Sequence, residues 1–358
     1  MLHSIPDSTQ RSELWKVVAL QERLVNALCA LPPQTKVEVA WLKAVWKELP
    51  KEWVARFWKN EKQRRAEWMQ TISAASKADK KKMLAIWKQQ MEFAKLYDNG
   101  TRFRLDPCDR SNKVLAAFGD LLTDFYAPLL YSNEGVPVMA KAEKMNKDLF
   151  ILGFTPNVKV CPYTDYPIPS RATKLDHFLP KEKFPALSCH PDNLFPCSTD
   201  ANNGGRKGSI PPLDLTAASQ AEAWFHPRLR SAREAFHVEV SQNTNREPTL
   251  RFVAHKAEDQ LRLEKLDGMF HLTETWAEHL DDAIGELSNT VSGMLMFARK
   301  PADFQNVREA VVLLTKQRIE DRKSGTRALA ISESYFYQHV ANSRPLLDEV
   351  LRACMQVL

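Results

Sequence analysis

The chain has 358 residues, of which 44% are hydrophobic and 26% are charged, and its net charge is +6. This composition is typical of a globular protein and excludes a largely disordered chain. The longest apolar runs fall far short of the roughly 20 residues that a membrane-spanning helix needs, and the first ten residues lack a secretory signal, so we expect a cytoplasmic protein without a membrane partner.

Residues 1–150 are expected to form a basic, tryptophan-rich helical region. Apolar residues follow a helical period from Leu14 to Leu28, before Pro32 and Pro33. The same reasoning predicts further helices over residues 37–49, 52–71, 78–97 and 112–130. Residues 1–110 contain 21 Lys and Arg against 13 Asp and Glu, an excess of +8. Such an excess suits a polyanionic partner, although solvated helical faces often carry similar charge.

The tryptophans are concentrated near the beginning of the chain. Seven of the nine lie among Lys and Arg within the first 90 residues: Trp15, Trp41, Trp46, Trp53, Trp58, Trp68 and Trp87. Aromatic side chains beside basic ones can stack on unpaired bases, whereas tryptophans at helical spacing pack in a core or dock on a partner. We expect core or docking for the tryptophans and phosphate contact for nearby basic residues such as Lys62, Arg64 and Arg65.

Residues 151–215 are expected to form a loop-rich insert, because Pro, Gly, Asn, Asp and Ser become frequent there and helical periodicity is lost. Residues 216–358 are expected to be mostly helical. They include one short β-hairpin, since residues 236–240 and 249–254 alternate around a polar turn. Later helices are predicted over residues 272–297, 301–322 and 328–358. The fold class is therefore mainly α with a small α+β insert between two helical regions.

The insert contains residue types that suit phosphodiester hydrolysis. An Asp176-His177 pair opens the run DHFLPK, an NLFPC run starts at Asn193, and Asn202 follows nine residues after Asn193. Over about 55 residues this pattern resembles the HNH endonucleases of the His-Me finger superfamily. The resemblance implies a ββα-metal nuclease module at residues 151–215, with helical regions before and after it.

The resemblance also implies a role for each residue. His177 would be the general base, since the unperturbed pKa of an imidazole lies near neutrality. Asp176 and Asn202 would bind Mg²⁺ or Mn²⁺ through oxygen. Asn193 would hold the loop after the first strand through backbone hydrogen bonds. The candidate phosphate contacts are Lys181, Lys183, Arg206 and Lys207.

The cysteines depart from the family pattern. Six cysteines spread over the chain predict no disulfide framework. Related HNH modules hold a structural zinc ion with two cysteine pairs, and a zinc site of this kind needs four ligands. Cys161 and Cys197 stand where the two pairs begin, but Thr164 and Ala201 occupy the partner positions. We therefore expect no structural Zn²⁺; Cys189 and His190 are the alternative ligands.

Two functions remain open at the level of sequence. The resemblance implies a metal-dependent endonuclease that cuts DNA, similar to the nuclease subunits of bacterial anti-phage or restriction systems, in which a separate ATPase or sensor protein controls cutting. The alternative is a catalytically inactive HNH-fold subunit that acts as a nucleic-acid-binding or assembly protein. The missing zinc cysteines favour the alternative, whereas the presence of Asp176, His177, Asn193 and Asn202 opposes it.

Overall fold

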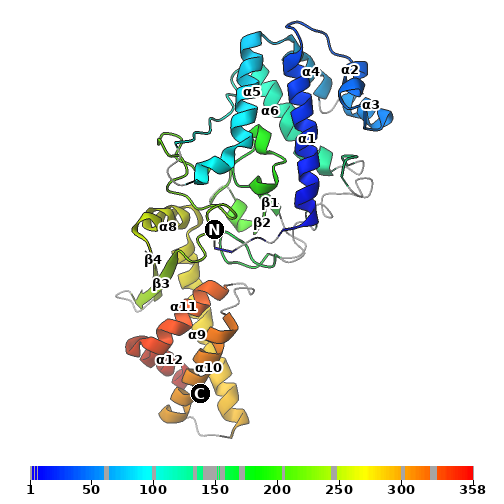
Figure 1. Ribbon diagram of the computed structural model, residues 1–358. Helices are drawn as coiled ribbons and strands as arrows, with labels where there is room; N and C mark the ends of the chain where they lie inside the picture. Colours follow the sequence, from blue (N-terminus) through cyan, green and yellow to red (C-terminus); the bar gives the residue numbers. More distant parts are fainter. Residues whose placement is uncertain are drawn as a thin grey trace. The chain divides into compact units, whose positions relative to one another are not determined.

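The computed structural model describes residues 2–3, 5, 7–59, 64–98, 102–131, 135–139, 151, 153, 158–168, 174–203, 206–242, 248–299, 303–322 and 329–357. These residues are mainly helical and include two antiparallel sheets of two strands each (Figure 1), which confirms the mainly α class with small β segments. None of the helices described is both long and apolar enough to cross a membrane.

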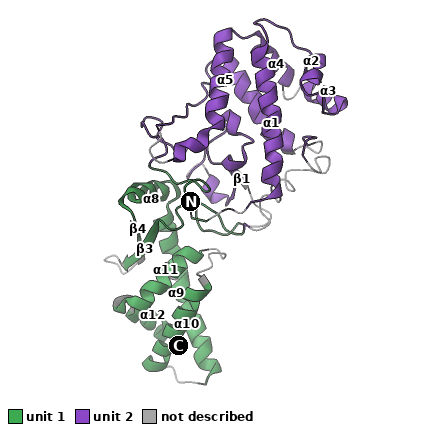
Figure 2. Cartoon of the chain, viewed as in Figure 1, with its two compact units in different colours: residues 1–4, 159–169, 223–358 green, residues 5–158, 170–222 purple. Residues whose placement is uncertain are grey.

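The chain forms two compact units (Figure 2). Unit 1 comprises residues 1–4, 159–169 and 223–358, and unit 2 comprises residues 5–158 and 170–222. This division differs from the three consecutive regions expected from the sequence, because most of the insert packs with the N-terminal helices.

Unit 2 is built around a group of helices in mutual contact. They are α1 (Thr9–Ala30), α2 (Val39–Val45), α3 (Lys51–Lys59), α4 (Arg65–Ala74), α5 (Lys77–Met91) and α6 (Lys113–Tyr126), with the 3₁₀ turns η2 (Phe93–Tyr97) and η3 (Leu129–Tyr131). Side chains cap two helix starts: Ser76 accepts a hydrogen bond from the Asp79 amide, and Asn112 accepts from the Val114 and Leu115 amides. The helix predicted over residues 52–71 is divided into α3 and α4.

Most of the N-terminal tryptophans lie in the core of unit 2. Trp46 is fully buried, and its ring contacts those of Trp53, Phe57 and Phe125. Trp87 is also buried, and Trp41, Trp58 and Trp68 are partly buried against the same core. Trp15 is the exposed exception among the seven, at 47%. Six of the seven tryptophans therefore pack in or against the core, because their helices meet around one apolar centre.

One basic residue of this region has a structural role that the sequence did not indicate. Arg65 is buried, and its Nε atom lies 2.5 Å from Oδ2 of Asp124, which is also buried. The Arg65 guanidinium also lies over the Phe57 ring. The expectation that Arg65 contacts phosphate is wrong for this structure, since its charge is enclosed and paired. Arg64 is exposed, and Lys62 lies outside the described residues.

The insert contributes a two-stranded sheet to unit 2. Strand β1 (Lys174–His177) pairs antiparallel with β2 (Leu194–Cys197). Between them, the 3₁₀ turn η5 (Pro185–Leu187) packs against α5 and α6, and η6 (Pro191–Asn193) packs against α1. Two strands of four residues cannot enclose a core of their own, so the insert shares that of the helices.

The segment after β2 differs from the expected ββα pattern. It begins with a single 3₁₀ turn, η7 (Asp200–Asn202), and the described residues from there to Glu222 contain no α-helix. The sequence gives a physical reason, since Gly204-Gly205 and Pro211-Pro212 both disfavour a helix. The insert therefore contains two paired strands, but the described residues from Asp200 to Glu222 contain no α-helix that would complete a ββα arrangement.

Unit 1 combines a β-hairpin with helices. Strands β3 (Phe236–Gln242) and β4 (Pro248–Ala254) pair antiparallel, which confirms the predicted hairpin. The helices that follow are α8 (Ala257–Phe270), α9 (Leu272–Phe297), α10 (Phe304–Arg322), α11 (Ala330–Asn342) and α12 (Arg344–Val357). Residues 159–169 also belong to this unit, because Trp276 donates to the Thr164 carbonyl and Ile331 donates to the Asp165 carboxylate.

Candidate active site

Asp176 and His177 lie next to each other at the end of strand β1. Asp176 is paired with Phe195 in the sheet register, and His177 is paired with Leu194. Both side chains are almost enclosed, at 3% exposure for Asp176 and 9% for His177. Their environment therefore determines their chemistry more strongly than solvent does.

The His177 ring is oriented by one hydrogen bond and one aromatic contact. Its Nε2 atom lies 2.9 Å from the backbone carbonyl oxygen of Ser188, and its ring meets the Tyr126 ring edge-on at 4.3 Å between centroids. A carbonyl only accepts hydrogen bonds, so Nε2 carries the proton of the neutral ring and Nδ1 is the proton acceptor. Burial, assisted by the charge of Lys181, lowers the pKa of His177 to about 4. The imidazole is therefore neutral at pH 7.

Ser188 and Tyr126 were not expected from the sequence. The Ser188 hydroxyl donates to the Leu122 carbonyl of α6 at 2.9 Å, which ties the carbonyl that holds His177 to a helix. Tyr126 lies at the end of the same helix. No local signal identifies either residue, because both reach His177 through the packing of α6 against the insert.

Asn193 connects the two sides of the loop between β1 and β2. Its Oδ1 atom accepts from the Leu179 amide at 2.7 Å, and its Nδ2 atom donates to the carbonyls of Leu179 and Leu187 at 3.0 and 3.1 Å. The side chain is fully buried. Asn193 therefore fixes the backbone of Leu179, two residues after His177, relative to that of Leu187.

Lys207 forms an ion pair with the carboxylate of Asp176. Its Nζ atom lies 2.9 Å from both carboxylate oxygens and 2.7 Å from the His177 carbonyl oxygen, and the side chain is fully buried. The expected phosphate contact by Lys207 is not possible in this structure, because the ammonium is enclosed and already paired. In this state Asp176 does not fit a divalent cation either, since its charge is neutralised from within the chain.

The other predicted site residues lie nearer the surface. Asn202 is half-buried at the end of η7, and no described contact joins it to Asp176. Lys181 is 28% exposed and forms an ion pair with Glu182. Lys183 and Arg206 are half-buried. These three basic residues keep partial access to solvent, which a phosphate contact requires.

The two cysteines that stand at the expected zinc positions are assigned to different units. Cys161 belongs to unit 1 and Cys197 to unit 2. Of the alternative ligands, Cys189 is fully buried, which raises the pKa of its thiol and keeps it protonated. The His190 Nδ1 atom accepts from the Asp192 amide at 3.1 Å, and its ring packs against Trp15 and Phe93. This packing gives His190 a structural role.

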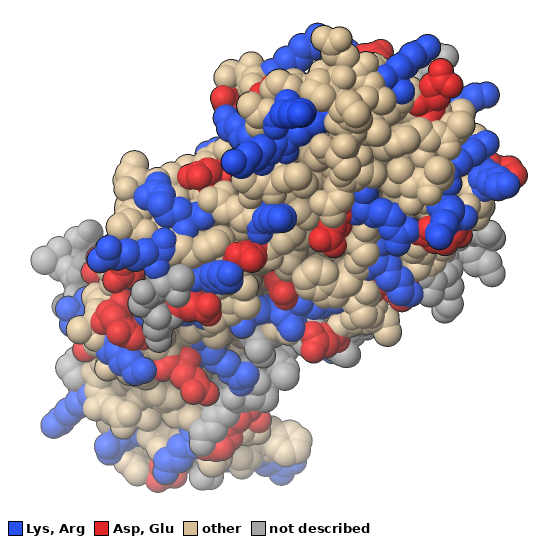
Figure 3. Space-filling view, turned by 45° about the horizontal axis from the view of Figure 1, so that its top comes forward, with Lys and Arg blue, Asp and Glu red and all other residues tan. Residues whose placement is uncertain are grey.

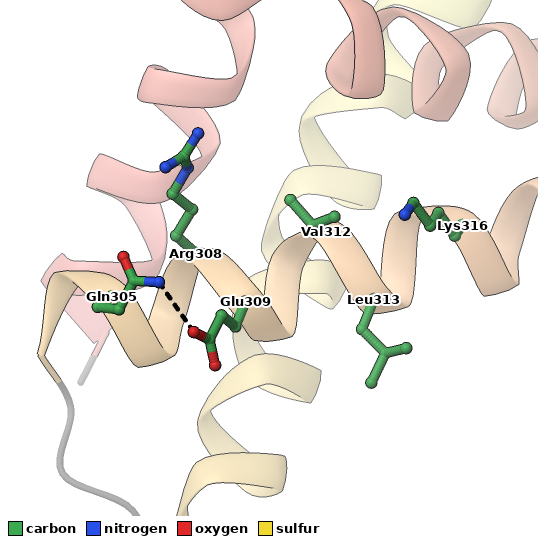
Figure 4. A pocket seen from close by; sticks show the side chains of 6 residues that line it. All are labelled: Gln305, Arg308, Glu309, Val312, Leu313 and Lys316. Carbon is green, nitrogen blue, oxygen red and sulfur yellow. Dashed lines mark hydrogen bonds between the residues drawn. The ribbon is translucent and has the colours of Figure 1, made fainter.

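Two surface features are also relevant. Lys and Arg side chains gather in several groups on the face seen in Figure 3, and the exposed positions of α5 include Lys77, Lys81, Lys82 and Lys88. In unit 1, a shallow pocket of about 320 Å³ is lined by Gln305, Arg308, Glu309, Val312, Leu313 and Lys316 (Figure 4). Because all of these pocket residues come from α10, no groups from different elements converge there as in a catalytic site.

Comparison of the chain with models of known protein families, with curated proteins and with solved structures finds no match.

Proposed function

We propose that the chain is an HNH-type endonuclease that hydrolyses phosphodiester bonds of DNA. The observation that carries the proposal is the state of His177. Its neutral ring is held through Nε2 on the Ser188 carbonyl, which leaves Nδ1 as a proton acceptor. Asp176 precedes it on the same strand, and Asn193 braces the loop behind it. A fixed, neutral imidazole with one acceptor nitrogen suits general-base catalysis.

The chemistry of His177 would depend on the substrate. In the proposed reaction Nδ1 accepts a proton from the attacking water, and the imidazolium then needs electrostatic stabilisation. A pKa of about 4 is low for a base that works near pH 7. A phosphate group beside the ring would raise this pKa, because a nearby negative charge stabilises the imidazolium. Mg²⁺ or Mn²⁺ enters the proposal only for a state in which Lys207 has left Asp176.

The proposal also assigns two surfaces of the chain to partners, one to DNA and one to another protein. The exposed lysines of α5 supply a basic surface for the DNA backbone. In unit 1, the end of α9 and the start of α10 expose Met296, Phe297 and Phe304, at 76%, 93% and 55%. Exposed apolar groups of this kind favour contact with another protein. An ATPase or sensor subunit of a bacterial anti-phage or restriction system would be such a partner.

A second candidate function is supported by one observation. Lys207 neutralises Asp176 within the chain, so the site also suits a catalytically inactive subunit that binds nucleic acid or assembles with a partner. The two functions make different predictions: an endonuclease cleaves DNA and needs His177 to do so, whereas an inactive subunit binds without cleaving.

The test is cleavage of supercoiled plasmid DNA, with an RNA substrate in parallel, in Mg²⁺ or Mn²⁺. We expect nicking by the wild type and none by His177→Ala. His190→Asn is the matched control, because it replaces another buried histidine of the insert with a side chain that can still accept from the Asp192 amide. Equal cutting by the wild type and His177→Ala would reject the proposal, and DNA binding without cutting by any variant would favour the inactive subunit.

A further inference from the structure

Lys207 and Asp176 form an ion pair from which solvent is excluded. Lys207 is fully buried and Asp176 is 3% exposed. A lysine ammonium has three N–H donors. Both carboxylate oxygens of Asp176 and the His177 carbonyl oxygen lie within 2.9 Å of Nζ, so three acceptors are available for the three donors. The ammonium is thus held at a defined position beside the carboxylate.

This position conflicts with binding of a divalent cation. Mg²⁺ lies about 2.1 Å from its carboxylate oxygens, and Mn²⁺ also prefers oxygen ligands. The Lys207 Nζ atom already lies 2.9 Å from both oxygens of Asp176. Two cations on one carboxylate would be only a few ångströms apart in a protein interior, where like charges repel more strongly than in water. Lys207 and a divalent cation therefore exclude each other at Asp176.

The backbone around Lys207 is an irregular turn. Residues 206–209 belong to no helix or strand. The described backbone hydrogen bonds of the turn include one from the Arg206 amide to the Asn203 carbonyl at 3.0 Å and one from the Ile210 amide to the Lys207 carbonyl at 2.8 Å. Gly208 has a φ of 46°, in the left-handed region that favours glycine.

We propose that Lys207 is the resident cation of this site and excludes divalent metal from Asp176. The inference rests on the proposed function for the biological use of the site. The competition between the Lys207 ammonium and a metal ion for Asp176 is a separate property. It is measured without DNA.

The first test is Mn²⁺ binding followed by electron paramagnetic resonance. Lys207→Met keeps most of the length of the side chain and removes its charge, and we expect it to bind one Mn²⁺ at least about tenfold more tightly than the wild type. Adding Asp176→Asn to Lys207→Met should abolish this site. Lys181→Met removes a charge from the same insert, in the loop between β1 and β2, without uncovering Asp176, and should bind Mn²⁺ as the wild type does. Equal binding by the wild type and Lys207→Met would overturn the proposal.

The second test uses the wild type and does not depend on a variant that folds. Reductive methylation of the metal-free protein, read by mass spectrometry, should modify the exposed Lys88 fully while Lys207 remains protected. Modification of both lysines at the same rate would overturn the proposal. Absence of DNA cleavage in every variant would reject the proposed function alone, whereas equal Mn²⁺ binding by the wild type and Lys207→Met would reject the role of Lys207 alone.

Discussion

His177 places its Nε2 atom 2.9 Å from the carbonyl oxygen of Ser188, and this contact fixes which ring nitrogen can act as a base. The Ser188 carbonyl belongs to the loop that Asn193 braces, and the Ser188 hydroxyl is bound to α6. The orientation of the candidate base therefore depends on the packing of the insert against the helices of unit 2. The stability of this packing can be measured separately from any activity.

The free energy of unfolding is expected to fall as the pH drops from 6.5 toward 4. Burial lowers the pKa of both His177 and His190 from 6.5 to about 4. In this window the unfolded chain binds a proton at each histidine and the folded chain does not, so acid favours unfolding by up to about 3 kcal/mol per histidine. Burial raises the pKa of Asp124 from 3.8 to about 6, which opposes part of this loss. Urea unfolding at pH 7 and pH 4.5 measures the net change in the free energy of unfolding from these three residues.

His190→Asn separates the contribution of one histidine from the rest. The variant keeps an acceptor for the Asp192 amide and removes one of the two buried imidazoles. Its loss of stability between pH 7 and pH 4.5 should be smaller than that of the wild type by roughly one histidine's share. An unchanged acid dependence would show that His190 does not control it.

Asn193→Ala is expected to destabilise the chain by about 3–5 kcal/mol. The change removes three hydrogen bonds to backbone groups of Leu179 and Leu187 in a fully buried position, and those groups lose their partners. Asn112→Ala, which removes the cap of α6, is the comparison and should cost about 1 kcal/mol. Similar losses in urea unfolding for the two variants would contradict the bracing role of Asn193.

Breaking the pair between Lys207 and Asp176 should cost about 3–5 kcal/mol in the absence of metal, because either residue alone leaves an uncompensated buried charge. Lys207→Met and Asp176→Asn, measured by urea unfolding in chelator, give the two single losses. Lys95→Met removes the exposed pair with Glu92 and should cost at most about 1 kcal/mol. A loss for Lys207→Met as small as that for Lys95→Met would argue against an enclosed pair.

The purified protein is expected to contain no stoichiometric zinc and to keep its melting temperature in chelator. Thr164 and Ala201 occupy two of the four positions at which zinc cysteines are expected. The Cys189 thiol stays protonated because it is buried. Elemental analysis and thermal unfolding with and without chelator provide the measurement. One zinc ion per chain, removed together with the fold, would reverse this expectation.

Reversing the charge of three exposed lysines on α5 is expected to weaken DNA binding without unfolding the chain. The triple change is Lys77→Glu, Lys81→Glu and Lys88→Glu. For every lysine that binds a phosphate group in the wild type, its replacement should reduce the slope of log affinity against log salt concentration by about 0.9. Titration of labelled duplex DNA at several salt concentrations measures this slope.

The matched control for α5 reverses three exposed lysines of unit 1: Lys256→Glu, Lys265→Glu and Lys316→Glu. Both triple variants change the net charge of the chain by the same amount. If the affinity and the salt dependence fall equally in the two variants, the effect is one of overall charge, and α5 is not a specific contact surface.

The sequence by itself determined the elements whose signals are local. The apolar period over residues 272–297 coincides with α9 (Leu272–Phe297), and the two alternating segments around the polar turn form β3 and β4. Both patterns arise within one element and its nearest neighbours, where side-chain spacing alone sets which face is buried. The choice of Asp176, His177 and Asn193 as candidate site residues also came from the sequence.

Only the tertiary structure decided what those residues contact. Lys181 and Lys207 were equivalent in the sequence, as basic residues of one loop-rich insert, yet one is partly exposed and the other is buried on Asp176, 31 residues away along the chain. Ser188 and Tyr126 reach His177 only because α6 packs against the insert. Burial and pairing of this kind depend on elements far apart in sequence, and a local pattern contains no information about which distant element covers a given side chain.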